Sequence, residues 1–305
     1  MREGRGHDGG MADVGSNAAG TAGVPVNPGE VRACLAEMGV HPSRLLGQNF
    51  LVDRNILRIV LDAAEIGGGD EVLEVGPGLG GLTQGILSAG ARLTAIEKDK
   101  RLGERLGRVF AGEADAGRFR LIVADALDVP LAELFPAAGW KFAANLPYAV
   151  AARLLAGLPG MAHPAVRVVA TVQKEVAERL AAGPGDGAYG LLAVLVQRCY
   201  AVDIVHQVAP GCFWPRPDVQ SSIVRLRLLE EPRGGTCDWE RYKTIARTAF
   251  SHRRKTLAKG LSGAFPDAKA ALAAAGLAAD ARPEEVGTEG WARLAALPVS
   301  DGDGQ

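Results

Sequence analysis

The fold is decided by residues 71–97, which read EVLEVGPGLGGLTQGILSAGARLTAIE. A short strand at 71–75 runs straight into a glycine-rich turn, a helical pattern follows, and a second strand ends at Glu97. Glycines permit positive φ angles and let the backbone approach a ligand closely. Glu97 follows Gly76 by 21 residues, where a carboxylate can accept both hydroxyls of an adenosine ribose. Turn, strand and acid together favour a nucleotide-binding site over a plain tight turn.

The same alternation of strands and helices continues on both sides of this stretch. Apolar residues at helical spacing predict a helix over 55–64, with Asp53 as its N-cap, and a second helix over 100–110. Strands at this spacing are typical of a parallel, doubly wound α/β sheet, which binds ligands beyond the carboxyl ends of its strands. The further strands are expected at 119–123, 141–144, 165–172, 204–208 and 222–229.

Composition is that of a globular protein. The 305 residues are 48% hydrophobic and 23% charged, with 34 Lys and Arg against 35 Asp and Glu, a formal net charge of −1. Neither an apolar run of about 18 residues nor an apolar leader is visible, so no membrane segment or secretion signal is expected. The four cysteines form no CxxC pair, which predicts neither disulfides nor a structural metal and favours the cytoplasm.

The chain divides into four parts. Residues 1–29 are rich in Gly and Ala with few large apolar side chains, so we expect a disordered tail. A Rossmann-like domain is expected over 30–232. After the Pro-Arg-Gly-Gly boundary, residues 236–298 are Ala-rich and helix-forming and predict a small helical domain, and a short tail follows at 299–305.

Two further strand ends carry polar residues. Asp125 follows the third strand, where its carboxylate can accept the exocyclic amine of an adenine, and Asn145 opens the tetrapeptide Asn-Leu-Pro-Tyr at 145–148. An amide oxygen and a backbone carbonyl can accept the two N–H groups of a substrate amine, and Tyr148 offers a face on which a flipped base can stack. The glycine spacing alone leaves NAD and S-adenosylmethionine (SAM) open as ligands, and this element favours SAM, whose methyl group is already activated.

Six motifs stand in a fixed order within residues 41–265. They are GQNFL at 47–51, EVGPGLG at 74–80, NLPY at 145–148, QKEV at 173–176 with GPG at 183–185 and YG at 189–190, FWPRP at 213–217 with VQSS at 219–222, and FSHRRKT at 250–256. In this order they resemble the motifs of the small-subunit ribosomal RNA adenine-N6,N6-dimethyltransferases. The family's Asn-Leu-Pro-Tyr element is often followed by Asn and then Ser or Thr, whereas Ala-Val-Ala-Ala stands here at 149–152.

The resemblance implies a role for individual residues. Asn49 and Leu51 would contact the methionyl end of SAM, Gly76 would lie under it, Glu97 would hold its ribose and Asp125 its adenine. Asn145 would lie beside the reacting methyl group, with Phe213 facing Tyr148 across the target base. The implied catalytic residues are Asn145, Leu146, Tyr148 and Phe213, and the implied cofactor-binding residues are Asn49, Leu51, Gly76, Glu97, Asp125 and Asn145, with no metal ligand.

The near-neutral total charge conceals a basic segment. Residues 241–260 contain seven Lys and Arg and no acidic residue, so the rest of the chain carries net negative charge. Such a cluster is typical of phosphate contacts with nucleic acid, whereas a merely solvated helix face normally includes acids. We expect Arg253, Arg254 and Lys255 to contact RNA.

The resemblance implies a SAM-dependent enzyme that dimethylates two adjacent adenines in the 3′-terminal hairpin of small-subunit (16S) rRNA during 30S biogenesis. The expected partner is a 30S assembly intermediate, and a monomer is expected. Three alternatives remain: a large-subunit rRNA adenine methyltransferase conferring macrolide resistance, a non-catalytic ribosome-assembly or transcription factor on the same fold, and, more distantly, an NAD oxidoreductase.

Overall fold

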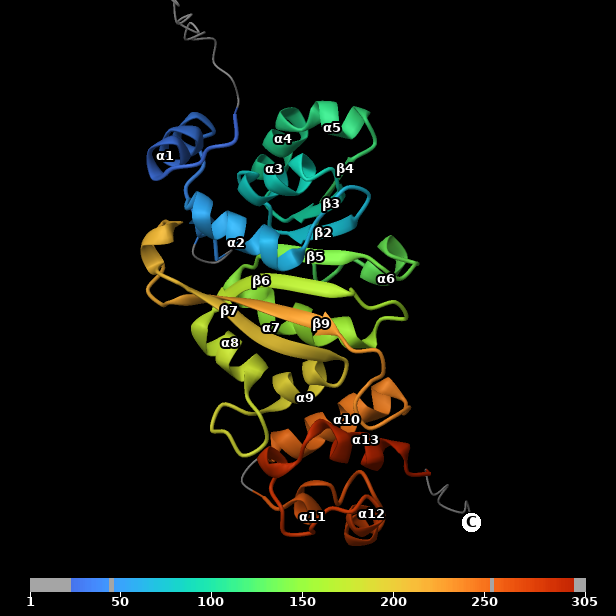
Figure 1. Cartoon of the computed structure of the whole chain (residues 1–305). Helices are drawn as coiled ribbons and strands as arrows, with labels where there is room; N and C mark the ends of the chain where they lie inside the picture. The colour runs from blue at the N-terminus through green and yellow to red at the C-terminus, as the bar shows by residue number, and fades with distance from the viewer. Residues whose placement is uncertain (1–22, 44–46, 253–254, 299–305) are drawn as a thin grey trace, which may run out of the picture.

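The computed structural model describes residues 23–43, 47–252 and 255–298. Within these residues a seven-stranded sheet lies at the centre, in the order β4-β3-β2-β5-β6-β9-β7 (Figure 1). Its carboxyl edge, where the glycine-rich turn follows β2, is the edge that the sequence predicts to bind a ligand. The strands are β2 (Glu71–Val75), β3 (Arg92–Glu97), β4 (Phe119–Val123), β5 (Lys141–Asn145), β6 (Arg167–Gln173), β7 (Tyr200–Val208) and β9 (Ser221–Leu228).

The sheet is parallel from β4 to β6, as predicted, but β9 departs from the prediction. β9 pairs antiparallel with both β6 and β7. The reason is the connection: β7 reaches β9 without a crossover helix, and strands joined in that way pair antiparallel. A second, two-stranded sheet joins β1 (Phe50–Leu51) to β8 (Phe213–Trp214). That pairing ties the GQNFL motif to the FWPRP motif.

Helices cover both faces of the large sheet, and each face has its own apolar core. On one face α2, α3 and α4 pack against residues such as Val72, Ala143 and Ile223. On the other, α7, α8 and α9 pack against Phe142 and Val224. The helices of this part are α1 (Pro28–Glu37), α2 (Arg54–Ala64), α3 (Gly81–Ser88), α4 (Lys100–Val109), α5 (Ala111–Asp115), α6 (Leu131–Leu134), α7 (Tyr148–Gly157), α8 (Lys174–Ala181) and α9 (Leu191–Gln197).

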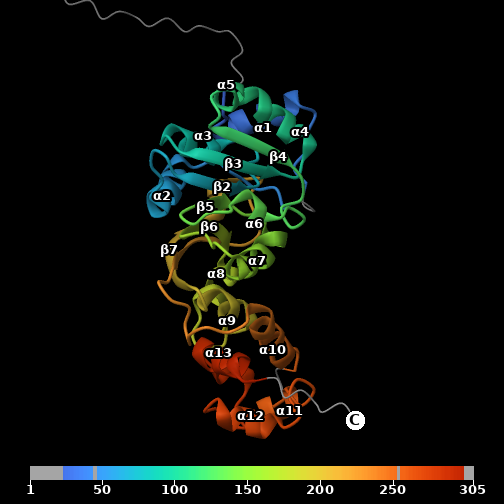
Figure 2. The same cartoon turned by 90° about the vertical axis from the view of Figure 1, so that its right-hand side faces the viewer.

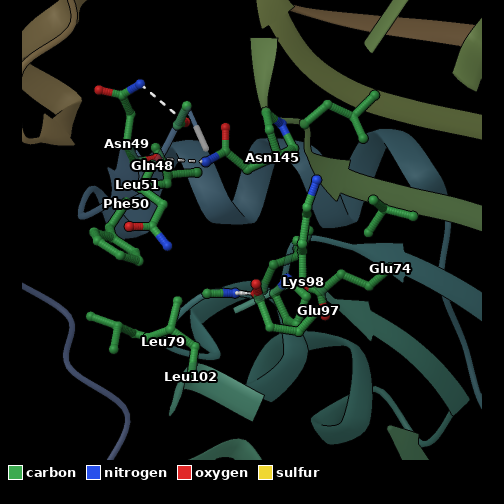
Figure 3. Close-up of a pocket in the computed structure, with 18 of the residues that line it drawn as sticks. Gln48, Asn49, Phe50, Leu51, Glu74, Leu79, Glu97, Lys98, Leu102 and Asn145 are labelled. Atoms are coloured by element: carbon green, nitrogen blue, oxygen red, sulfur yellow. Dashed lines mark hydrogen bonds between the residues drawn. The ribbon is translucent and has the colours of Figure 1, made fainter. Parts of the chain in front are cut away.

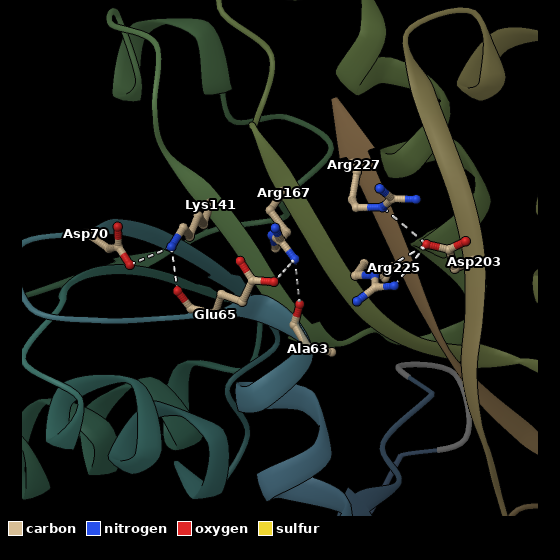
Figure 4. Close-up of polar contacts among 8 residues, drawn as sticks. All are labelled: Ala63, Glu65, Asp70, Lys141, Arg167, Asp203, Arg225 and Arg227. Atoms are coloured by element: carbon tan, nitrogen blue, oxygen red, sulfur yellow. Dashed lines mark hydrogen bonds and ion pairs between the residues drawn. The ribbon is translucent and has the colours of Figure 1, made fainter. Parts of the chain in front are cut away.

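Helix α2 is stabilised at one end by a residue next to it in sequence and at the other end by cations from distant strands. Asp53 caps it as predicted, accepting hydrogen bonds from the backbone N–H groups of Asn55 and Ile56. At the other end Lys141 donates to the Glu65 carbonyl and Arg167 to the Ala63 carbonyl (Figure 4). Positive charge at a helix C-terminus is favourable because the helix dipole is negative there. These contacts fasten α2 to the amino ends of β5 and β6.

The C-terminal helices lie beyond α9, at the end of the molecule away from β4 (Figures 1 and 2). Within the described part of residues 236–298 there is no strand, as predicted. The C-terminal helices share one apolar core with α9, since Val194 and Leu195 pack in the same cluster as Tyr242 and Trp291. The helices are α10 (Trp239–Ser251), α11 (Leu257–Gly260), α12 (Ala268–Ala274) and α13 (Thr288–Ala296).

The N-terminal boundary differs from the sequence prediction. Helix α1 begins at Pro28, with Asn27 as its N-cap, inside the segment assigned to a disordered tail. Ahead of it, the carbonyl of Gly23 accepts a hydrogen bond of 2.7 Å from Arg105, and Val24 packs against the core. A buried arginine from a distant helix therefore holds a segment whose composition alone does not predict order. None of the described helices is long and apolar enough to cross a membrane.

Candidate active site

A pocket lies at the carboxyl edge of the sheet, and most of the predicted site residues line it (Figure 3). β1 and the segment before it form one wall, and the ends of β2, β3 and β5 form the floor. The structure therefore brings together side chains that lie far apart in the sequence. The predicted residues that line this pocket are Asn49, Leu51, Gly76, Glu97, Asp125, Asn145, Leu146 and Tyr148.

The glycine-rich turn has the backbone that its sequence predicts. Gly76, Gly78 and Gly80 all have positive φ, at +71°, +59° and +93°. A Cβ at Gly76 would lie 3.3 Å from the ring of Pro147, so the turn packs directly against the Asn-Leu-Pro-Tyr element. A side chain at this position would be both strained and crowded. The turn therefore leaves open backbone facing the pocket.

Glu97 is buried, and backbone donors fix its carboxylate. One oxygen accepts the N–H of Gly78 at 3.0 Å and the other the N–H of Asp99 at 2.9 Å. Burial raises the pKa of Glu97, and these two hydrogen bonds oppose the rise. Each carboxylate oxygen has a second lone pair, so the group can still accept two hydroxyls from a ligand.

Glu74 is a second buried carboxyl group in the pocket wall, and it is not among the site residues predicted from the sequence. Its side chain accepts a hydrogen bond of 2.6 Å from the Thr83 hydroxyl. Complete burial raises the pKa of Glu74 to about 8, and the neighbouring Glu97 adds to the rise. The signal in the sequence is an acid between Leu73 and Val75, within the buried part of a strand, which is costly unless the group is protonated or hydrogen-bonded.

Asp125 lies in the pocket but is already engaged. One oxygen forms a 2.7 Å ion pair with Lys98 and the other accepts the N–H of Leu127 at 3.0 Å. The hydrogen bond from Lys98 is the main cause that lowers the pKa of Asp125. Lys98 also lines the pocket, and it is not among the site residues predicted from the sequence.

Asn145 has a fixed amide orientation. Its Nδ2 donates a 2.9 Å hydrogen bond to the backbone carbonyl of Asn49 (Figure 3). A carbonyl oxygen can only accept, so the NH₂ group must be the one that faces Asn49. The amide oxygen is therefore left on the side away from Asn49, available to accept a hydrogen bond. A free acceptor at this position is what the predicted contact with a substrate amine needs.

Phe213 is the one predicted catalytic residue outside the pocket lining. It pairs with Leu51 across the two-stranded sheet, and its side chain is 3% exposed within an apolar core cluster. Its predicted contact with a base stays a prediction. Tyr148, by contrast, lines the pocket and its hydroxyl shares a 2.8 Å hydrogen bond with Ser221.

The predicted RNA-contact residues are only partly described. Arg253 and Arg254 lie outside the described residues, whereas Lys255 follows α10 and is exposed. Elsewhere in the same segment, Lys243 is paired with Glu240. Among the described residues, no group of three or more His, Cys, Asp or Glu side chains is placed to hold a metal ion.

This fold, with buried acids and an oriented amide at its carboxyl edge, is that of a Rossmann-like methyltransferase. The profile of the ribosomal RNA adenine dimethylase family matches residues 42–297, and the chain belongs to this family. Ribosomal RNA small subunit methyltransferase A of Opitutus terrae is 41% identical over 277 residues, covering 89% of this chain and 98% of that protein. The corresponding protein of Nocardia farcinica is 41% identical over 297 residues, covering 94% and 99%.

Solved structures agree with this assignment. A dimethyladenosine transferase from Plasmodium falciparum is similar with a TM-score of 0.65 and 25% identity, covering 79% of this chain and 94% of that one. The 23S rRNA methyltransferase ErmE is similar with a TM-score of 0.60 and 27% identity, covering 81% and 98%.

Proposed function

We propose that this protein transfers methyl groups from SAM to N6 of two adjacent adenines in the 3′-terminal hairpin of small-subunit rRNA. The observation that carries the proposal is the amide of Asn145, which Asn49 orients within a pocket that also holds the predicted adenosine acceptors. The relatives named small subunit methyltransferase A, at 41% identity over nearly their full length, support the choice of rRNA.

The pocket residues fit the adenosine half of SAM. Glu97 has free lone pairs for the ribose hydroxyls, and Asp125 has them for the adenine amine. Gly76 lines the pocket and has no side chain, so it offers only backbone to a ligand there. SAM, when bound, supplies a sulfonium methyl group that is already activated for transfer.

The chain's own contribution to chemistry is to orient the substrate amine. The lone pair of adenine N6 is delocalised into the ring, which makes it a poor nucleophile. The amide oxygen of Asn145 accepts one N–H, and a backbone carbonyl of the Asn-Leu-Pro-Tyr turn accepts the other, so the lone pair turns out of the ring plane. These acceptors gain strength as positive charge develops on N6. Tyr148 supplies a face on which the flipped base stacks.

Two other functions are less well supported. A large-subunit rRNA methyltransferase is the nearer one, because ErmE shares the fold, but its identity of 27% is well below the 41% of the small-subunit relatives. A non-catalytic assembly factor on the same fold would have no need of the oriented Asn145 amide or the buried Glu97 carboxyl. The proposed setting is cytoplasmic, with a monomer acting on a 30S assembly intermediate.

The direct test is to incubate the purified protein with labelled SAM and 30S particles that lack adenine methylation, and then to map the modified bases. The proposal expects label on two adjacent adenines near the 3′ end of the small-subunit rRNA. Label in large-subunit rRNA supplied in parallel, or none in either RNA, would overturn it. Free rRNA serves as the control for a requirement that the particle be assembled.

RNA affinity can be separated from chemistry by replacing Arg253, Arg254 and Lys255 with Ala. Removing up to three phosphate contacts should reduce the slope of log K against log salt by up to about 3. The affinity for SAM should be unchanged, because the pocket is lined by residues of the other part of the chain. An unchanged salt slope would show that these residues form only a solvated face.

A further inference from the structure

The hydroxyl of Tyr148 ends on a buried serine. Its oxygen lies 2.8 Å from the Oγ of Ser221, whose residue is fully buried, whereas Tyr148 is only partly buried and lines the pocket. Tyr148 is the first residue of α7, and Ser221 is the first residue of β9. Among the described residues, Ser221 is the hydrogen-bond partner of the Tyr148 hydroxyl.

Ser221 is a rigid anchor because its strand is paired on both sides. It lies opposite Gln173 of β6 and opposite Val208 of β7. Tyr148 follows β5, and β6 lies between β5 and β9 in the sheet. The phenol must therefore reach across the carboxyl end of β6 to its partner, which fixes the direction of the ring as well as its distal atom.

Helix α7 itself supplies no polar side chain immediately after Tyr148. The three residues that follow it in α7 are Ala149, Val150 and Ala151. The Ser221 segment is held from its other end as well, because Phe213, eight residues earlier, pairs with Leu51 in the pocket wall. One stretch of chain, residues 213–221, thus connects the wall beside the predicted methionyl site to the ring beside the predicted base site.

We propose that Ser221 is a positioning residue for the transfer reaction: its hydroxyl tethers the Tyr148 phenol so that the ring presents one face to the flipped adenine. This inference rests on the proposed function. Burial raises the pKa of Tyr148, so the phenol keeps its proton at neutral pH and acts as one end of the tether.

The test is a double-mutant cycle with Tyr148→Phe, Ser221→Ala and the double variant, with Ser222→Ala as the matched control. Ser222 is equally buried and adjacent, but it points to the opposite face of the strand. Each single variant should raise KM for the 30S substrate by about three- to tenfold, the worth of one buried hydrogen bond. The double variant should be no worse than either single one, and SAM affinity should stay within about twofold.

Fully additive losses in the double variant, or an equal loss in Ser222→Ala, would overturn the tether. Tyr148→Ala, which also removes the ring, should lose more, about 10- to 100-fold in substrate affinity at the target base. If it loses no more than Tyr148→Phe, the ring does not stack and its orientation is irrelevant.

A second readout keeps the tether separate from the proposed function. The same cycle is measured by urea unfolding without RNA or SAM, where the tether predicts that the double variant is no less stable than the worse single one. If that coupling is present but the wild type methylates no adenine, the proposed function fails and the contact stands. If methylation is normal but the coupling is absent from both unfolding and KM, the tether fails.

Discussion

The carboxylates at the two ends of the central sheet have different kinds of partner. At the amino end, ion pairs join Asp70 to Lys141, Glu65 to Arg167, and Asp203 to Arg225 and Arg227 (Figure 4). At the carboxyl end, Glu74 and Glu97 are 1% and 6% exposed, and among the described residues neither forms an ion pair. Their partners are a hydroxyl and backbone N–H groups.

This difference separates the acids that hold the fold together from the acids at the proposed ligand site. Burying a carboxyl group without a cation lowers stability, because the charged form loses its hydration. The acids of the amino end do not bear that cost, because they are paired with cations and remain in part exposed: the side chains of Glu65, Asp203 and Asp70 are 60%, 38% and 24% exposed. At the carboxyl end, Glu74 and Glu97 are buried, and within the described chain no cation is paired with either. Acids with a perturbed pKa in a pocket are typical of ligand sites. Asp125 is intermediate, since it lies in the pocket but is paired with Lys98.

The largest effect is expected from Asn145→Ala. Removing the oriented amide oxygen should slow single-turnover methyl transfer on the order of 100-fold, because that contact strengthens as N6 gains charge. Binding of rRNA should be nearly unchanged, since it rests on phosphate contacts. Rapid-quench kinetics with labelled SAM measures the rate, and full turnover by this variant would remove the amine-acceptor mechanism.

Glu97→Ala should weaken SAM binding by about 10- to 100-fold, or ~1.5–3 kcal/mol, because charge-assisted hydrogen bonds to the ribose are lost. Calorimetric titration measures the change. Asp70→Ala, at the paired end of the sheet, is the matched control and should leave SAM affinity unaltered while lowering stability. A SAM affinity within twofold of wild type in Glu97→Ala would show that the acid has another purpose.

Glu74→Gln should flatten the dependence of stability on pH. The native carboxyl keeps its proton up to about pH 8, whereas the unfolded one ionises near its ordinary value of 4.5. The unfolded state therefore binds fewer protons in this window, and the unfolding free energy falls as pH rises from 4.5 towards 8.

The slope removed by Glu74→Gln should be at most about 1.4 kcal/mol per pH unit. Urea unfolding at several pH values between 5 and 8 measures it. The unfolding free energy of the variant should rise relative to that of wild type as pH increases. If the two plots of unfolding free energy against pH are parallel, Glu74 is ionised in the native protein.

Arg167→Met should have the smallest effect, and it should change stability and not ligand binding. Losing the contacts with the Ala63 carbonyl and with Glu65 should lower the unfolding free energy by about 0.5–2 kcal/mol. SAM affinity should not change, because this end of the sheet is remote from the pocket. If this variant also binds SAM more weakly, the amino end of the sheet contributes to the ligand site and the two ends do not differ in function.

Local patterns made much of the fold predictable. The strand ends at Glu97 and Asn145, the Asp53 cap and the glycine turn were recoverable, because each depends on residues close in sequence. The insertion of β9 between β6 and β7 was not, since strand order is decided by long-range packing. The packed segment before Glu30 was missed for the same reason, as its partner Arg105 lies 82 residues away.

The site shows the same division. The residue types at the strand ends indicated a nucleotide pocket, and the structure gathers them there. Their partners could not be predicted: Ser221 is 73 residues from Tyr148, and Lys98 is 27 from Asp125. Phe213 illustrates the limit of a motif, because its side chain is in the core and its proposed contact with a base stays a prediction.

Whether the pocket at the carboxyl edge, which Glu97 and Asp125 line, binds SAM is decided by titrating the wild-type protein with SAM and, in parallel, with NAD. Isothermal calorimetry of both ligands at one pH and salt concentration is sufficient. We expect saturable binding of one SAM per chain and no detectable binding of NAD. Binding of NAD without binding of SAM would contradict it.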